Sequence, residues 1–181
     1  MSLQHPQTTA TDRHPAEPRR FIPAAAADLP ETADELLARA RAAWHDVPAA
    51  TALLAKALAA APDCLPLHYA RYKFHSSHGQ YALAEAAARA ALAEAARQAG
   101  ISADWRTLDR TADPDAIDWA DVHGAAHFYL FTLKALAYLR LRRGDHAEAG
   151  ALLDTLARLD PADRVGAAVT RSLLQSVADA A

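Results

Sequence analysis

One spacing recurs along this chain and constrains its fold more than any other feature. Gly144 lies five residues before Ala149, and Pro161 lies twelve residues after it. The same two offsets separate the residues of two earlier triplets, His45, Ala50 and Pro62, and Gly79, Ala84 and Ala96. The central alanines are 34 and then 65 residues apart, and 65 is 34 plus an insertion of 31. This period predicts stacked helical hairpins, because each hairpin buries its open face only against the next.

Hydrophobic periodicity divides the chain into seven expected helices. Apolar residues recur at spacings of three and four, and Gly or Pro falls between the periodic stretches. We expect helices at 31–45, 48–61, 65–78, 82–98, 124–143, 146–159 and 164–178. Thr32, with Glu35 three residues on, is the predicted N-cap of the first. The predicted fold is all-α, a solenoid of three helical hairpins followed by a C-terminal capping helix.

Two stretches break the periodicity and set the domain organisation. Residues 1–30 are polar and rich in proline, which predicts a disordered N-terminal arm preceding a helical domain at 31–181. An arm that orders on a partner through Arg19, Arg20, Phe21 and Ile22 stays open. The second stretch, about 99–123, contains Trp105 and Trp119. Either this insertion folds back and packs its tryptophans, or the two rings bind a partner.

The overall composition limits the classes of function. The net charge is -3, from 19 basic and 22 acidic residues, which argues against nucleic acid or an anionic membrane as a partner bound by bulk charge. No apolar run approaches the roughly 20 residues that span a bilayer. Cys64 is the single cysteine, which excludes an internal disulfide and fits a reducing compartment. We expect a cytoplasmic protein.

The repeated unit resembles the tetratricopeptide-repeat (TPR) family. Residues 144–149 (GDHAEA) are similar to the Gly-Asp-Tyr-x-x-Ala turn of that family, and Leu159-Asp160-Pro161 is similar to its closing signature. Residues 79–84 repeat the turn, and 61–63 repeat the close. The first unit lacks the turn glycine, and the second lacks the closing proline because its helix runs on. The resemblance implies a TPR-like solenoid that binds other proteins.

Two longer segments resemble a narrower group within that family. Residues 62–80 (PDCLPLHYARYKFHSSHGQ) and 126–145 (AHFYLFTLKALAYLRLRRGD) are similar to small TPR-like proteins encoded among bacterial nitrogen-fixation genes. That resemblance implies a non-enzymatic accessory factor that binds nitrogenase or its assembly machinery. A generic peptide-binding TPR adaptor is the alternative.

The first helix of each hairpin is expected to line one concave face, and this face holds the candidate site. By register it carries aromatic side chains beside lysine and arginine, a combination suited to an extended acidic peptide or a carboxylate terminus. The predicted partner-binding residues are Tyr69, Lys73, Ser76, Phe131, Lys134, Tyr138 and Arg142, together with Trp105 and Trp119 of the insertion. The opposing interpretation places Tyr69 and Phe131 in the core and leaves the basic residues merely solvated.

An enzyme is the alternative from another class. The pairs His75 and His78, and His123 and His127, have spacings that place two metal ligands on one helix face, but neither has a complete ligand set. Cys64 would lie at a helix start, which lowers a thiol pKa, with His68 one turn further on. Neither arrangement completes a catalytic motif. We therefore expect no enzymatic activity, no cofactor and no metal.

Overall fold

The computed structural model describes residues 31–108 and 117–180, and these form seven helices and no strand. The helices are α1 (Glu31–Ala42), α2 (Val47–Ala60), α3 (Leu65–Ser77), α4 (Tyr81–Ala99), α5 (Ala125–Arg142), α6 (His146–Leu159) and α7 (Ala168–Asp179). The all-α prediction is confirmed. The prediction for residues 1–30 lies outside the described part of the chain.

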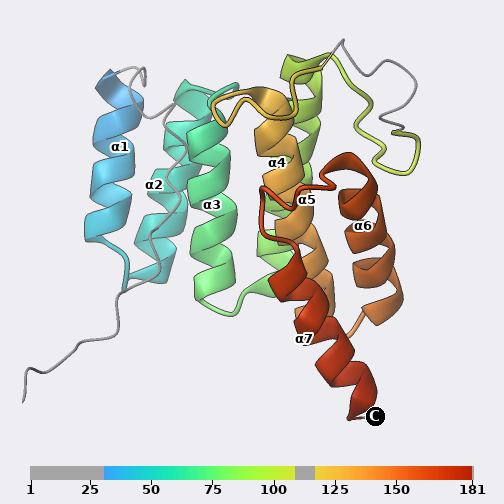
Figure 1. The fold of residues 1–181 in the computed structure, drawn as a ribbon. Coiled ribbons are helices and arrows are strands. Elements are labelled where there is room, and N and C mark those ends of the chain that lie inside the picture. The colour runs from blue at the N-terminus through green and yellow to red at the C-terminus, as the bar shows by residue number, and fades with distance from the viewer. Residues whose placement is uncertain (1–30, 109–116, 181) are drawn as a thin grey trace, which may run out of the picture.

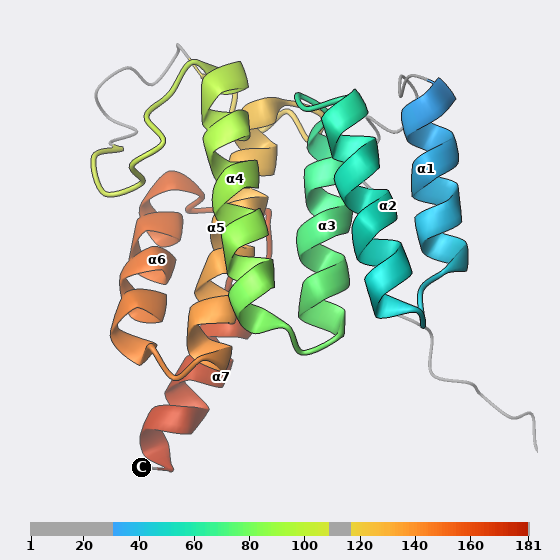
Figure 2. The same cartoon turned by 180° about the vertical axis from the view of Figure 1, so that it is seen from behind.

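Sequence-adjacent helices run antiparallel and pack in pairs, α1 with α2, α3 with α4, and α5 with α6. Helices α1, α3 and α5 share one side of the molecule, which faces the viewer in Figure 1, and α7 lies on the same side. Figure 2 shows the opposite side, with α2, α4 and α6 in front. Helix α4 packs against both α3 and α5, so it joins the second pair to the third.

The turns between paired helices use local residues suited to a sharp reversal. Asp46 accepts a hydrogen bond from the Ala49 N–H at 3.1 Å and caps α2, and Asp145 caps α6 through the Glu148 N–H at 3.2 Å. Each carboxylate satisfies an N–H group that has no partner inside its helix. Gly144 has a φ of 80°, a left-handed conformation that glycine adopts without steric cost.

Two separate clusters of buried side chains form the interior. The N-terminal core joins α1 and α2 to one side of α3 and consists of Ala33, Leu37, Ala40, Ala50, Leu54, Ala57, Ala61, Leu67 and Phe74. The central core joins α3 to α4, α5, α6 and the insertion; its largest fully buried side chain is Tyr129. Helix α3 contributes to both cores, which fits its apolar residues on more than one face.

The prediction of two helices is wrong in part, and α1 ends at Ala42, three residues before its predicted end at 45. Helix α1 already includes Thr32, so Thr32 is not its N-cap. Helix α7 begins at Ala168, four residues after the predicted start at Arg164. The intervening chain turns instead, because the Val165 N–H donates to the Asp160 carboxylate at 2.9 Å and Gly166 takes a φ of 69°.

The described parts of the insertion, 99–108 and 117–123, pack against the body of the protein. Trp105 and Trp119 are each only 5% exposed and belong to the central core. The guanidinium of Arg106 lies 4.1 Å from the Trp105 ring centroid and donates to both carboxylate oxygens of Glu148 on α6, at 2.7 and 2.8 Å. Assigning the two tryptophans to a partner-binding surface was therefore wrong, and the alternative that the insertion folds back is correct.

Candidate functional site

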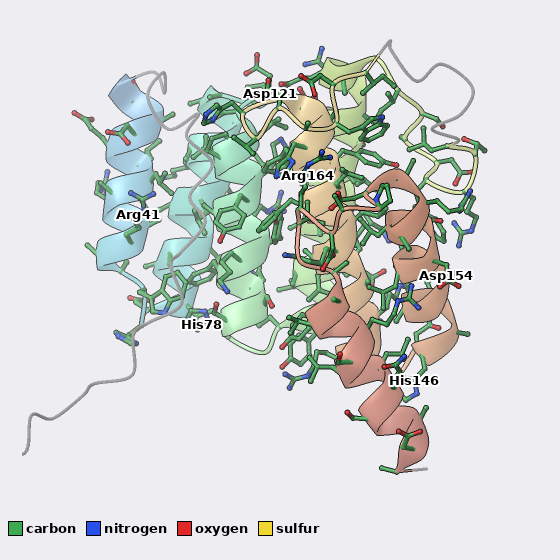
Figure 3. All side chains as sticks on the ribbon, in the orientation of Figure 1. Arg41, His78, Asp121, His146, Asp154 and Arg164 are labelled. Carbon is green, nitrogen blue, oxygen red and sulfur yellow. The ribbon has the colours of Figure 1, made fainter. Side chains whose placement is uncertain are left out.

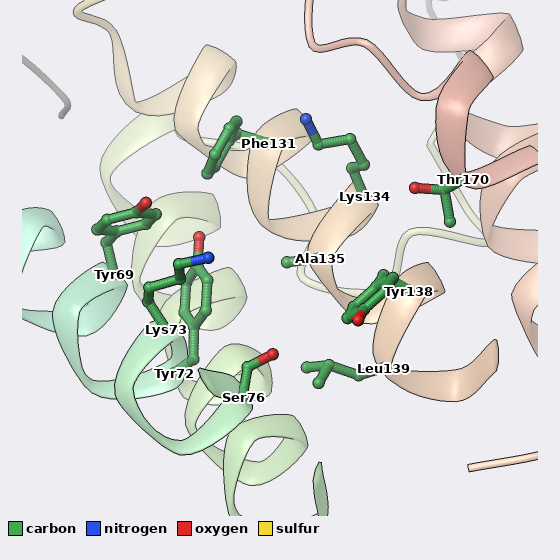
Figure 4. A pocket seen from close by; sticks show the side chains of 10 residues that line it. All are labelled: Tyr69, Tyr72, Lys73, Ser76, Phe131, Lys134, Ala135, Tyr138, Leu139 and Thr170. Atoms are coloured by element: carbon green, nitrogen blue, oxygen red, sulfur yellow. The ribbon is translucent and has the colours of Figure 1, made fainter. Parts of the chain in front are cut away.

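An open pocket of about 200 Å³ lies between α3 and α5 (Figure 4). We call it the α3–α5 groove. Its lining residues are Tyr69, Tyr72, Lys73, Ser76, Phe131, Lys134, Ala135, Tyr138, Leu139 and Thr170. All come from α3 and α5 except Thr170, which belongs to α7.

Helical periodicity explains why these side chains meet. On α3, Tyr69, Lys73 and Ser76 follow one another at spacings of four and three, and Tyr72 lies beside them. On α5, Phe131, Lys134, Ala135, Tyr138 and Leu139 repeat the same pattern. Side chains at these spacings lie on one face of a helix. Since α3 and α5 lie side by side, the two faces enclose the groove.

Aromatic rings form one end of the groove. The ring centroid of Tyr69 lies 5.8 Å from that of Phe131 across the groove and 5.4 Å from that of Tyr72 on its own helix. Separations of this size allow tilted and edge-to-face contacts, which stabilise the position of each ring. Tyr69 and Phe131 remain only partly buried, so this end offers an apolar surface that is already in place.

Lys134 connects the groove to the segment before α7. Its ammonium donates a hydrogen bond to the Val165 carbonyl and lies 4.6 Å from the Phe131 ring centroid. Burial lowers the pKa of Lys134, and the nearby Asp163 carboxylate opposes that shift. Lys134 therefore lines the groove while holding the segment between α6 and α7 against it.

Two further cations lie on the rim. Arg142 donates to the Tyr138 hydroxyl at 2.9 Å, and its guanidinium lies 4.8 Å from the Tyr81 ring centroid. Lys73 is exposed and has no ion pair with any residue that the structure describes. An unpaired lysine beside aromatic rings leaves a positive charge available to a ligand.

Charge is segregated along the helices that form the groove. Helices α3 and α5 contain no Asp or Glu, and their basic residues are Arg71, Lys73, Lys134, Arg140 and Arg142. Arg140 is used elsewhere, because it pairs with the buried carboxylate of Glu85 on α4 at 2.7 Å. In a chain with a net charge of -3, these two helices therefore carry basic residues and no acidic ones.

The structure brings most of the predicted partner-binding residues together. Tyr69, Lys73, Ser76, Phe131, Lys134 and Tyr138 all line the groove, and Arg142 lies beside Tyr138 at its edge. Sequence reasoning missed Tyr72, although its place three residues after Tyr69 was a signal. It also missed Thr170, whose position depends on how α7 packs and has no signature in the sequence.

Two of the histidines considered as metal ligands, His75 and His78, make other contacts. His75 hydrogen-bonds Gln80 at 2.8 Å, and His78 lies between two backbone carbonyls. No group of three or more His, Cys, Asp or Glu side chains placed to hold a metal ion occurs within residues 31–108 and 117–180.

Cys64 lies at the start of α3, as the sequence predicts, and it is the N-cap residue of that helix. Burial raises the pKa of Cys64, and the Asp63 carboxylate adds to the shift, against the smaller lowering effect of the Leu67 N–H. His68 directs its Nε2 to the Pro62 carbonyl at 2.8 Å. Burial therefore outweighs the helix N-terminus at this thiol, which argues against its use as a nucleophile.

No known protein family, curated protein or solved structure matches this chain. Of the helices that the structure describes, none is long and apolar enough to cross a membrane.

Proposed function

We propose that this chain is a non-enzymatic binding protein that holds an extended acidic segment of another protein in the α3–α5 groove. The observation that carries the proposal is the exposed Lys73 among aromatic rings, without an ion pair in residues 31–108 and 117–180, on two helices that contain no acidic residue. Acidic side chains would approach this face favourably, and apolar side chains between them would contact the rings.

The arrangement of helices supports a TPR-like solenoid of three hairpins capped by α7. In such an array, equivalent positions of successive units contact one another at an offset near the repeat length. His78 Nε2 lies 3.0 Å from the carbonyl oxygen of Trp44, and these residues are 34 positions apart. Gln98 donates to the carbonyl of Asp63, 35 positions away. The first offset equals the period of 34 residues, and the second exceeds it by one.

The size of the groove favours a peptide over a small molecule. Pockets that enclose drug-sized ligands usually measure roughly 300–1,000 Å³, whereas this one measures about 200 Å³ and is open. A volume of this kind accommodates one or two side chains of a segment that continues beyond it. Recognition would then spread along the face of α3 and α5.

Nitrogenase components and their assembly factors are the first candidate partners. The support is the resemblance of residues 62–80 and 126–145 to small TPR-like proteins of nitrogen-fixation gene clusters. Capture on the immobilised protein from cells grown with and without fixed nitrogen tests this partner. Absence of nitrogenase components from both captures would leave the generic acidic-peptide adaptor as the function.

Charge reversal at Lys73 tests the groove directly. The full-length protein and its Lys73→Glu variant are immobilised, and captured proteins are identified by mass spectrometry. Lys56→Glu is the matched control, because Lys56 is an exposed lysine of α2, on the opposite side of the molecule. We expect specific partners to be lost with Lys73→Glu and retained with Lys56→Glu.

A photo-crosslinker at Ser76 supplies a second readout. Ser76 lines the groove and is only partly buried, so a reactive group there would label a bound segment. Fragmentation of the crosslinked product then identifies the segment and its charge. Equal capture by the wild type and the Lys73→Glu variant, with no crosslink from position 76, would remove the groove as the binding site.

A further inference from the structure

Two buried hydroxyl groups lie beneath the aromatic end of the α3–α5 groove, and the fold does not use them. Tyr72 of α3 is 3% exposed and Thr132 of α5 is 0% exposed. Neither hydroxyl makes a hydrogen bond of normal geometry with a residue in 31–108 or 117–180. Buried polar groups in native proteins nearly always have a partner, because a group without one has lost its hydration for nothing in return. Two such groups beside an open pocket indicate a point of ligand recognition.

The two hydroxyls are close neighbours at the groove. Burial raises the pKa of Tyr72, and the adjacent Thr132 hydroxyl opposes that shift. Tyr72 lines the groove, and Figure 4 shows its hydroxyl directed toward the end formed by Tyr69 and Phe131. The ring centroids of Tyr69 and Phe131 are 5.8 Å apart, and both side chains are only partly buried. A ligand side chain that enters between these two rings would therefore reach the hydroxyl pair.

The charges around this point favour a carboxylate as the group that enters. The ammonium of Lys134 lies 4.6 Å from the Phe131 ring centroid, and Lys73 lines the same groove. Neither ammonium has an ion pair with a residue that the structure describes. A carboxylate would accept from both hydroxyls at once and would also attract the two ammonium groups. A neutral amide could accept the same hydrogen bonds but would leave both positive charges unpaired.

We infer that the groove selects a glutamate of the bound segment through the hydroxyls of Tyr72 and Thr132. The methylene groups of this glutamate would pass between the rings of Tyr69 and Phe131, and its carboxylate would accept a hydrogen bond from each hydroxyl. Hydrogen bonds to a charged group are stronger than neutral ones and offset the desolvation of the carboxylate. Buried donors also discriminate against an apolar side chain of the same length, since they would then stay unpaired. This inference rests on the proposed function and adds the residue type that the groove recognises.

Substitutions that remove only a hydroxyl separate recognition from folding. Tyr72→Phe and Thr132→Val each delete one hydroxyl and keep a side chain of nearly the same shape. Because no hydrogen bond of the fold is lost, neither variant should melt more than about 2 °C below the wild type. Tyr129→Phe is the matched control, since the Tyr129 hydroxyl is also buried without a hydrogen-bond partner in the described chain, but Tyr129 does not line the groove.

Peptide selection on the full-length protein tests the residue type. A phage-displayed library of random peptides is selected on the immobilised wild type, and enriched peptides are synthesised with each glutamate replaced in turn by methionine, an unbranched apolar side chain of similar length. We expect one glutamate whose replacement weakens binding to the wild type about tenfold and has little effect on binding to Tyr72→Phe. Tyr72→Phe and Thr132→Val should each bind the original peptides about tenfold more weakly, and Tyr129→Phe should bind them as the wild type does.

Two results would overturn this inference while the proposed function stands, provided that Lys73→Glu still abolishes peptide binding. The first is an equal effect of the methionine replacement on binding to the wild type and to Tyr72→Phe. The second is a larger loss of melting temperature in Tyr72→Phe than the limit above, which would show that the fold already uses this hydroxyl. Peptides that bind Lys73→Glu as tightly as the wild type, or a selection that enriches no peptide, would instead overturn the proposed function and this inference with it.

Discussion

The N-terminal core and the central core are built from the same helical unit, yet they are filled differently. The N-terminal core is dominated by alanine, with Leu37, Leu54, Leu67 and Phe74 as its larger side chains. The central core gathers tryptophan, tyrosine, phenylalanine and many leucines from α4, α5, α6 and the insertion. Burial of large apolar side chains contributes most to stability, so the second region should be the more stable one.

The difference between the two cores bears on which of them supports the α3–α5 groove. The aromatic end of the α3–α5 groove rests on the central core, to which Trp105 and Trp119 of the insertion also belong. The N-terminal core meets the same region through one helix, α3. In repeat-like proteins each unit contacts only its neighbours, so damage at one end need not reach the groove.

The largest effect is expected from Trp105→Ala, which removes a buried ring from the central core. Truncation of a large buried aromatic usually costs about 3–5 kcal/mol of unfolding free energy, and Trp105 is 5% exposed. Chemical denaturation measures the change. Val122→Ala, at a side chain that is 48% exposed, is the matched control and should stay within about 0.5 kcal/mol. A Trp105 variant as stable as that control would restore the partner-binding role of the ring.

The next effect compares the same truncation in the two cores. Leu54 on α2 is 4% exposed and Leu152 on α6 is 2% exposed. Replacing either one by alanine should lower the free energy of unfolding by about 2–4 kcal/mol. We expect Leu54→Ala to reduce amide-exchange protection in α1 and α2 while α5 and α6 keep theirs. Leu152→Ala should reduce protection in α5 and α6. Equal loss of protection throughout by both variants would mean that the two cores unfold as one unit.

The sequence predicted most of the helices, because periodicity and turn chemistry are local. The bounds of α6 are those predicted, and α2 to α5 begin and end within one residue of the prediction. The start of α7 was missed because residues 164–167 turn before the helix, with the N–H groups of Val165 and Ala167 donating to Asp160 and Asp163 and with Gly166 at a φ of 69°. Packing of the insertion was left open since an aperiodic segment does not reveal what its tryptophans contact.

The site was predicted in part for the same reason. Register alone placed Tyr69, Lys73 and Phe131 on one face, and those residues do meet. Register does not report long-range contacts, so neither Thr170 nor the hydrogen bond from Lys134 to Val165 was foreseen. The TPR-like arrangement and the binding role remain predictions that the experiments above test.

A smaller effect is expected at His78 (Figure 3), which links the end of α3 to the turn between α1 and α2. Its Nδ1 and Nε2 lie 2.8 and 3.0 Å from the carbonyl oxygens of Phe74 and Trp44, and its ring contacts both aromatic side chains. His78→Ala removes these contacts and should cost about 1–2 kcal/mol. It should also broaden the thermal transition, because the N-terminal core would unfold more independently. A single, equally sharp transition in the variant would argue against this role.

The smallest effect is expected from Glu94, at a second polar link between the two regions. Glu94 pairs with Arg97 and accepts from Gln98, which also donates to the Asp63 carbonyl between α2 and α3. The hydrogen bond from Arg97 lowers the pKa of Glu94 from 4.5 to about 2.

Because the carboxyl pKa is lower in the folded protein than in the unfolded chain, Glu94 stabilises the fold at pH values above about 4.5. That contribution disappears as the pH falls from about 4.5 to about 2. Water screens this exposed pair, so Glu94→Gln should lower the melting temperature at pH 7 by only about 1 °C. The difference from wild type should vanish near pH 2, and a difference that instead grows in acid would show that Glu94 acts through something other than its charge.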